Sequence, residues 1–372
     1  DESMLIACAE YLKKQGFKKI SLLASKDACY PEAVRKEFKL LYYRSHRMNL
    51  LEKARIVAAL FSHKNMLLFG ADMMDGGYGE SSVSKRCQYL KWAQEAGLNV
   101  IILGASFRAS ITPKTAEELK RIPSEVKIYA RDPISEDNFR SQLGREAMLS
   151  ADVAFLLSPR SESPTVVNVK EWINKKKKDA MPIIGVNPFT NQNVLLGIKD
   201  EEKFSRFYVS LLHLLKQKIP TAAFLFVSHD SRNFPKRTSD AVINAKVFSL
   251  LAGEWGDDLL LVTEKASASE IRAIAGMLDF SICGKMHFAI SCLSMNIPAF
   301  SIGYLGKFKG LYSMVALPRY HIEAEDVQSI EQLAAQMIAA WEQRGEAQRK
   351  LKNIISELVI PRAKANFNFL AY

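Results

Sequence analysis

Two basic residues, His287 and Lys307, lie 20 positions apart in the stretch 281–307. The pattern of this stretch predicts a buried strand that ends at Gly284, a helix that begins at His287, and a second strand over 299–304. His287 and Lys307 are therefore expected at the carboxyl ends of neighbouring parallel strands. In an open α/β sheet this edge is where ligands bind.

The chemistry that these residue types suggest is an anion site with a proton donor. Lys285 and Lys307 flank His287, and cationic side chains beside the free N–H groups of a helix N-terminus attract anions. Nearby lysines lower the pKa of a histidine and a bound phosphate raises it, so His287 would act as a general acid on an anionic substrate. The alternative is a core histidine that is hydrogen-bonded to the backbone.

A second group of candidates follows the strand predicted over 126–130. Arg131 suits bidentate recognition of a carboxylate or phosphate, and Ser135 could cap the next helix or contact the same ligand. The alternative is that Arg131 and Asp132 lie on a solvated edge.

Other strand ends also carry polar residues. Asp72 and Asp75 lie in a glycine-bearing loop, where they could bind a metal, accept the proton of a sugar hydroxyl, or only cap the loop. This loop lacks the GxGxxG order of dinucleotide-binding sites. His229 follows a strand that ends at Val227 and is expected to face the same cleft as His287.

The elements that must position these residues alternate between strands and helices, which predicts parallel sheets. We expect an α/β protein of two Rossmann-like, doubly wound parallel-sheet domains that face a cleft, with 151–157 as the last strand of the first. The expected segments are an N-terminal domain, a linker, a C-terminal domain and a helical tail that packs back on the first domain, over 1–157, 158–180, 181–345 and 346–372. Because the first helix begins right after Asp1 and Glu2, as if it followed a strand, we expect residues upstream of position 1.

The composition narrows the class of protein. A formal net charge of +11 predicts an anionic partner, but the basic residues are scattered without interleaved aromatic residues, which disfavours nucleic acid. Five cysteines form no CxxC pair, so we expect free thiols and no structural zinc. No apolar run is long enough to span a bilayer, and a soluble cytoplasmic protein is expected. The run 175–178 of four lysines is either a solvated part of the linker or a contact with a membrane surface.

Together these motifs resemble the polysaccharide pyruvyl transferase family. The most specific match is Gly284-Lys285-Met286-His287 with the strand up to Tyr304 and with Lys307. Weaker matches are Asp1-Glu2, the strand and loop over 67–75, the strand and loop over 100–105, and Arg131-Asp132 with Ser135.

The resemblance implies a fold of the GT-B type and a reaction in which phosphoenolpyruvate gives its pyruvyl group to two hydroxyls of a sugar, as a pyruvate ketal. The sugar would belong to a cell-surface polysaccharide or its lipid-linked precursor. It implies that His287 is the acid catalyst, that Arg131 and Lys307 hold the carboxylate and phosphate of the donor, and that no cofactor or metal takes part. The N-terminal domain would bind the acceptor and the C-terminal domain the donor.

The chain departs from the family pattern at several places. Lys285 stands where an arginine is usual, Gly70-Ala71-Asp72 replaces a run of three glycines, and the loop over 104–107 lacks the usual Gly-x-Gly-Pro ending.

Two other functions remain as alternatives. One is a GT-B glycosyltransferase that uses a nucleotide sugar, with Glu270 as the carboxylate for the ribose, and the other is a non-catalytic protein that binds an anionic glycan.

Overall fold

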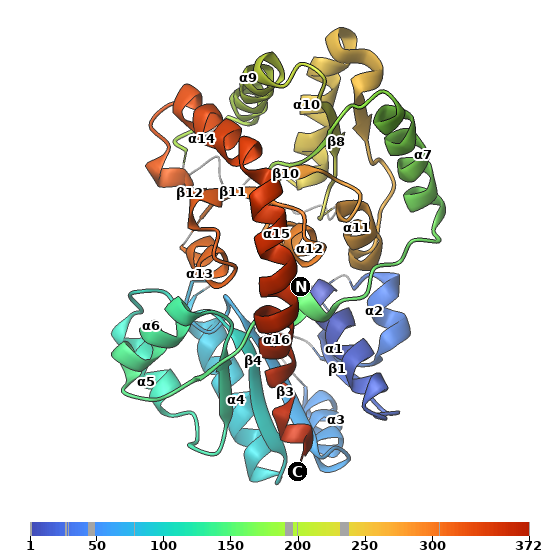
Figure 1. Cartoon of the computed structure of the whole chain (residues 1–372). Helices are drawn as coiled ribbons and strands as arrows, with labels where there is room; N and C mark the ends of the chain where they lie inside the picture. Colours follow the sequence, from blue (N-terminus) through green and yellow to red (C-terminus); the bar gives the residue numbers. More distant parts are fainter. Residues whose placement is uncertain are drawn as a thin grey trace. The chain divides into compact units, whose positions relative to one another are not determined.

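The chain divides into two compact α/β units, residues 1–157 with 359–372 and residues 158–358. A computed structural model describes residues 2–371 except 27, 29, 44–48, 78, 190–195, 199, 231–237 and 305. Figure 1 shows strands with helices around them in both units. The expected α/β class with parallel sheets is confirmed.

The strands of the first unit form two parallel sheets. One has the order β1-β2 and the other the order β3-β4-β5-β6. The larger sheet runs in sequence order because each helical crossover brings the chain to the adjacent position. The elements are α1 (Glu2–Lys14), β1 (Ser21–Ser25), α2 (Glu32–Glu37), β2 (Lys39–Tyr43), α3 (Leu50–Phe61), β3 (Asn65–Ala71), α4 (Glu80–Glu95), β4 (Asn99–Ala105), α5 (Pro113–Lys120), β5 (Lys127–Ala130), α6 (Pro133–Leu143), β6 (Met148–Leu149), η1 (Val153–Leu156), α16 (Ile360–Ala365) and η6 (Asn368–Ala371).

The second unit contains one parallel sheet of six strands in the order β12-β11-β10-β7-β8-β9. Its strands are β7 (Ile183–Asn187), β8 (Ala223–Phe226), β9 (Leu259–Leu261), β10 (Phe280–Cys283), β11 (Ala299–Gly303) and β12 (His321–Glu323). Its helices are α7 (Pro164–Lys178), α9 (Glu201–Lys218), α10 (Asp240–Trp255), η2 (Gly256–Asp258), α11 (Ala268–Ala275), α12 (Met286–Ser294), α13 (Lys307–Met314), η3 (Pro318–Tyr320), η4 (Ala324–Asp326), α14 (Ile330–Glu342) and α15 (Arg344–Ile354), and the π-helix η5 (Ile355–Val359) spans the boundary with the first unit.

The strand order of the second unit contains one reversal of direction. The chain begins at β7 in the middle, adds β8 and β9 on one side, and then crosses over to add β10, β11 and β12 on the other. Helix α9 packs on α10 and α14, whereas α11 packs on α7 and α12. Right-handed crossovers in the two directions place these two groups on opposite faces of the sheet. The reversal lies between β7 and β10, which is the point where such sheets bind ligands.

Two local predictions were wrong, and one strand was missed. The range 151–157 was expected to be a strand, but it contains the 3-10 helix η1, because the side chain of Asp152 accepts a hydrogen bond from the Ala154 N–H and closes a turn. Short apolar runs of this kind do not distinguish a strand from a buried helical turn. Strand β2 was not predicted, and the expected linker 158–180 contains helix α7, which starts at the cap of Ser163 and belongs to the second unit.

The four lysines at 175–178 form the last turn of α7 rather than part of a linker. Lys175 Nζ lies 2.8 Å from Asp257 Oδ2, Lys176 Nζ lies 3.1 Å from Asp258 Oδ1, and Lys177 Nζ lies 3.6 Å from Asp279 Oδ1. Ion pairs within the unit therefore account for most of this charge.

The expected helical tail is divided between the two units. Residues up to 358, with α15, belong to the second unit, and residues from 359 onward, with α16, belong to the first. Among the described helices, none is both long and apolar enough to cross a membrane.

Candidate active site

The strands that precede His287 and Lys307 are neighbours, as predicted. β10 pairs with β11 in parallel, with Ser281 opposite Ala299. His287 is the second residue of α12, which follows β10, and Lys307 is the first residue of α13, which follows β11. Both side chains therefore start from the carboxyl edge of the sheet, at the N-termini of α12 and α13, where the first N–H groups of a helix have no partner within the helix itself.

The backbone at Gly284 explains why this strand end needs a glycine. A Cβ at position 284 would lie 2.8 Å from the Cβ of Phe189, on the segment that follows β7. A side chain there would push β10 away from β7. Asn187, the last residue of β7, completes the junction, because its Oδ1 accepts the Lys285 N–H at 3.2 Å.

The ammonium group of Lys285 lies between two carboxylates. Its Nζ is 3.3 Å from Asp230 Oδ2 and 3.5 Å from Asp240 Oδ2, and it lies 4.9 Å from the centre of the Phe189 ring. Its side chain is only 12% exposed. These contacts give Lys285 a structural role between β8 and β10, and its predicted contact with substrate stays a prediction.

Asp240 is the centre of this network, and sequence reasoning missed it. The fully buried carboxylate accepts hydrogen bonds from the His229 N–H at 2.9 Å, the Asp230 N–H at 2.8 Å and the Asn187 side chain at 3.1 Å. Burial raises the pKa of Asp240, although Lys285 and the hydrogen bonds oppose the rise. Its signal in the sequence was weak, because an Asp at the start of a helix is usually only a favourable charge for the helix dipole.

The structure brings His229 next to His287. Their ring centres lie 6.1 Å apart at 27°, as stacked rings. The Nε2 atom of His229 is buried and makes no hydrogen bond to a described residue. Burial, followed by the charge of Lys285, lowers the pKa of His229 to about 3. His229 is therefore neutral near pH 7.

The low pKa of His229 is expected to make the free energy of unfolding depend on pH. An unfolded histidine titrates near pH 6.5. The contribution of neutral His229 is therefore complete above pH 6.5 and is lost as the pH falls toward about 3. In urea titrations, the difference in unfolding free energy between the wild type and His229→Phe should shrink by about 2 kcal/mol from pH 6.5 to pH 5. A difference that does not change with pH would contradict the assignment.

Lys307 lies beside an acidic residue that the sequence did not single out. Its Nζ is 3.9 Å from the centre of the Tyr304 ring. Glu323 ends β12 opposite Gly303, and its Oε2 accepts the Gly306 N–H at 3.3 Å. A Cβ at position 303 would lie 2.6 Å from Glu323 Oε1, so glycine leaves room for this carboxylate. Burial raises the pKa of Glu323.

In the first unit, Arg131 lies after β5 at the carboxyl edge of the sheet, and the alternative of a solvated edge is wrong. Arg131 and Asp132 are each 3% exposed, and Arg131 Nη1 lies 3.1 Å from Asp152 Oδ2. The Nε and Nη2 atoms of Arg131 are buried and bond to no described residue. The Ser106 hydroxyl, after the neighbouring strand β4, is in the same situation. Buried donors of this kind indicate a place for a ligand or water.

Ser135 takes part in a helix cap. Asp132 caps α6, accepting the Ser135 N–H at 2.8 Å and the Ser135 hydroxyl at 2.9 Å. Burial raises the pKa of Asp132 despite these bonds. The cap accounts for the Ser135 hydroxyl, and its contact with substrate remains a prediction.

The last residue of β3, Ala71, stands where the family pattern has a glycine. Ala71 has a φ of +41°, in the region that favours glycine, so an alanine there carries strain. Asp72 follows at the carboxyl end of β3 and is half-buried. Asp75 caps the loop, because it accepts the Gly77 N–H at 2.9 Å and pairs with Arg108 at 2.9 Å.

Glu270, the proposed carboxylate for a nucleotide ribose, is part of a capping box at the start of α11. Its Oε2 accepts the Ser267 N–H at 2.6 Å and the Ser267 hydroxyl at 2.7 Å. Burial would raise the pKa of Glu270, but these hydrogen bonds lower it overall. Capping accounts for this carboxylate without a ribose.

Comparisons with known proteins found one matching family. The sequence profile of the family described as "Polysaccharide pyruvyl transferase" matches residues 1–306. A search of curated proteins gave no significant match.

Many solved structures are similar in fold, and three of them are named below. One is described as a UDP-N-acetylglucosamine 2-epimerase from Listeria monocytogenes (TM-score 0.61, 10% identity, 100% of this chain and 92% of that chain). Another is the S. aureus MnaA-UDP co-structure (TM-score 0.59, 12% identity, 100% and 95%). The third is an α,α-trehalose-phosphate synthase (UDP-forming) from Burkholderia vietnamiensis (TM-score 0.51, 10% identity, 87% and 80%). At such low identity these likenesses show a GT-B-like fold and nothing of the substrate.

Proposed function

Because the chain belongs to the polysaccharide pyruvyl transferase family, we propose that it transfers the pyruvyl group of phosphoenolpyruvate to two hydroxyls of one sugar and forms a pyruvate ketal. The acceptor is a cell-surface polysaccharide under synthesis or its lipid-linked precursor. The observation that carries the proposal is the position of His287 and Lys307 at the ends of the paired strands β10 and β11.

In this proposal His287 is the general acid. It donates a proton to the methylene carbon of phosphoenolpyruvate, and positive charge develops at C2. The oxygen of the first hydroxyl bonds to C2, and the C2–O bond to phosphate breaks with its electron pair. The oxygen of the second hydroxyl then bonds to C2 and closes the ring. Of the two protons that the hydroxyls lose, one restores His287 and the other leaves with phosphate, so no oxidant or reductant is needed.

Cationic groups hold the anionic donor. Lys307, at the N-terminus of α13, serves the leaving phosphate, where the helix dipole adds to its charge. Arg131 offers the donor carboxylate its buried Nε and Nη2 groups, which bond to no described residue. Lys285 acts mainly as a positioning residue, because Asp230 and Asp240 hold its ammonium group.

The remaining assignments concern the acceptor and the place of action. Asp72 would take the proton of the second acceptor hydroxyl and pass it to the departing phosphate, with Ser135 near the donor carboxylate. We place the reaction in the cytoplasm, in line with the described cysteines, Cys8, Cys87, Cys283 and Cys292, which are buried free thiols. The ion pairs of the lysines at 175–178 favour their role within the unit over a membrane contact.

A glycosyltransferase that uses a nucleotide sugar is the second candidate, because the GT-B-like fold serves such enzymes as well. Its predicted ribose carboxylate, Glu270, already caps α11. We therefore favour pyruvyl transfer over a glycosyltransferase function.

The decisive experiment incubates the full chain with phosphoenolpyruvate and a set of glycans and lipid-linked oligosaccharides. We expect phosphate release that depends on an acceptor, and a product that is heavier than the acceptor by one pyruvate ketal in mass spectrometry. Release of a nucleoside diphosphate from a nucleotide sugar, without phosphate release from phosphoenolpyruvate, would favour the second candidate.

A further inference from the structure

Helix α3 of the first unit carries an unusual number of exposed apolar side chains. Leu50 is 83% exposed, Leu51 70%, Val57 47% and Phe61 73%. Tyr42, near the end of the preceding strand β2, is also exposed. Half of the large, exposed apolar residues of the described chain thus lie within 42–61. A contiguous group of this kind indicates an interaction surface.

The spacing of these residues places them on one side of the helix. Leu50, Val57 and Phe61 are separated by seven and four positions, which is two turns and then one turn of an α-helix. Ile56, on another side, is buried against the rest of the unit. The helix is therefore fixed by one face and presents a second apolar face that no described residue covers.

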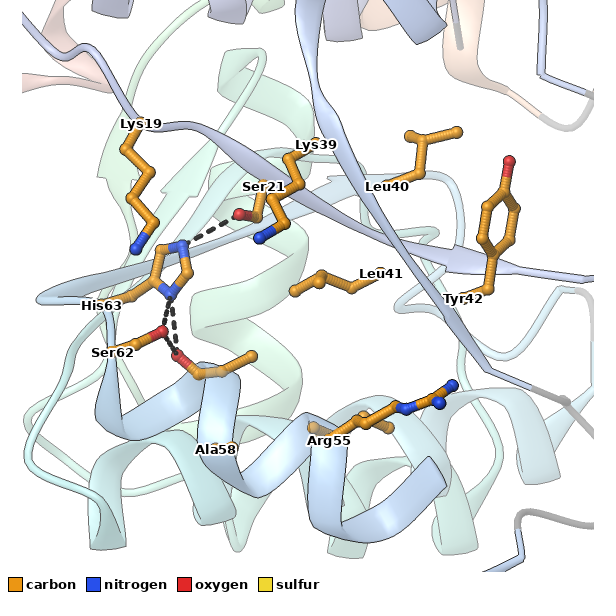
Figure 2. A pocket seen from close by; sticks show the side chains of 12 residues that line it. Lys19, Ser21, Lys39, Leu40, Leu41, Tyr42, Arg55, Ala58, Ser62 and His63 are labelled. Atoms are coloured by element: carbon orange, nitrogen blue, oxygen red, sulfur yellow. Dashed lines mark hydrogen bonds between the residues drawn. The ribbon is translucent and has the colours of Figure 1, made fainter. Parts of the chain in front are cut away.

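Three cations line a cavity next to α3. A cavity of about 390 Å³ lies between α3 and the strands β1 and β2, and Lys19, Lys39 and Arg55 line it without any carboxylate. Figure 2 shows the amino groups of Lys19 and Lys39 near His63, and Arg55 on α3 on the side of Tyr42. Within the described part of the chain, none of these three cations forms an ion pair.

The remaining polar groups near the cavity already have partners. His63 Nδ1 lies 2.7 Å from the Ala59 carbonyl oxygen and therefore donates to it, while Nε2 accepts from the Ser21 hydroxyl at 3.0 Å. The acidic residue of α3, Glu52, is buried and paired with Lys26 at 3.0 Å. The exposed charge of α3 and of this cavity is thus positive.

We propose that α3 and the cavity of Lys19, Lys39 and Arg55 form a docking surface for a bilayer that contains anionic lipids. An amphipathic helix with exposed leucine and phenylalanine and with neighbouring cations lies in the interface of such a bilayer. The apolar side chains enter the boundary of the acyl chains, and the cations meet lipid phosphates. The lysines at 175–178, by contrast, are compensated by aspartates and do not form this surface.

The test measures binding of the full chain to vesicles of phosphatidylglycerol and phosphatidylcholine by co-sedimentation, without donor or acceptor. We expect the wild type to bind the mixed vesicles and not pure phosphatidylcholine. Lys19→Gln and Lys39→Gln should each weaken binding about five-fold. Phe61→Ser should weaken it about ten-fold or more, because the variant lacks an exposed aromatic ring that would enter the bilayer.

Matched controls decide the location of the surface. Lys175→Gln changes a lysine that is paired with Asp257, and Leu250→Ser changes an exposed leucine on α10; both should bind like the wild type. No binding of the wild type, or an equal loss in the controls, would overturn the proposal. The proposal would also be overturned if Lys19→Gln and Lys39→Gln weaken binding but Phe61→Ser does not. Contact with phosphate groups alone would then explain the binding, without insertion into the bilayer. Because no step of pyruvyl transfer is measured, failure here leaves the proposed reaction untouched.

Discussion

His287→Asn is expected to lower the kcat/KM of pyruvyl transfer by about 10²–10⁴-fold, because the reaction loses its general acid. Phosphate release from phosphoenolpyruvate in the presence of an acceptor measures this effect. The fold should tolerate the change, since the ring is half-buried at the start of α12 and is stacked against the His229 ring at 6.1 Å. Its unfolding free energy is expected to change by less than about 1 kcal/mol.

A matched control is His213→Asn. His213 lies on α9, where its ring packs on Trp255 and its Nε2 lies 3.6 Å from Glu254. Its replacement should leave kcat/KM within a factor of two. If the His287→Asn enzyme has wild-type activity, His287 is not the general acid. The proposed pyruvyl transfer would still stand in that case.

Arg131→Met is expected to destabilise the protein by about 3–5 kcal/mol, because it leaves the buried charge of Asp152 without its cationic partner. The buried pair thus gives Arg131 a structural role beside the donor contact that the family resemblance implies. Urea unfolding of wild type and variant measures the effect.

A second variant separates the structural role of Arg131 from donor binding. In Arg131→Met with Asp152→Asn, no buried charge of the pair remains, so part of the lost stability should return. Phosphoenolpyruvate should raise the Tm of the wild type but not that of the double variant, if Arg131 holds the donor carboxylate. An equal rise in both proteins would remove Arg131 from the donor site.

The tertiary structure decided which charges are available to a ligand. Lys285 and the lysines at 175–178 read as free cations in the sequence, yet aspartates distant in the chain hold most of them. The partners, such as Asp230 and Asp240, lie on separate loops and helices. No local sequence pattern connects these positions. The sequence shows which residues are charged, but the ion pairs form only when the fold brings distant residues together.

The sequence by itself determined the alternation of strands and helices in both units and the strand-end positions of His287 and Lys307. These follow from local periodicity, glycine and proline, which act over a few neighbouring residues. Only the fold placed His229 beside His287, Glu323 beside Gly303, and Asp152 beside Arg131. Such contacts depend on strand order and register, which join residues that are far apart along the chain.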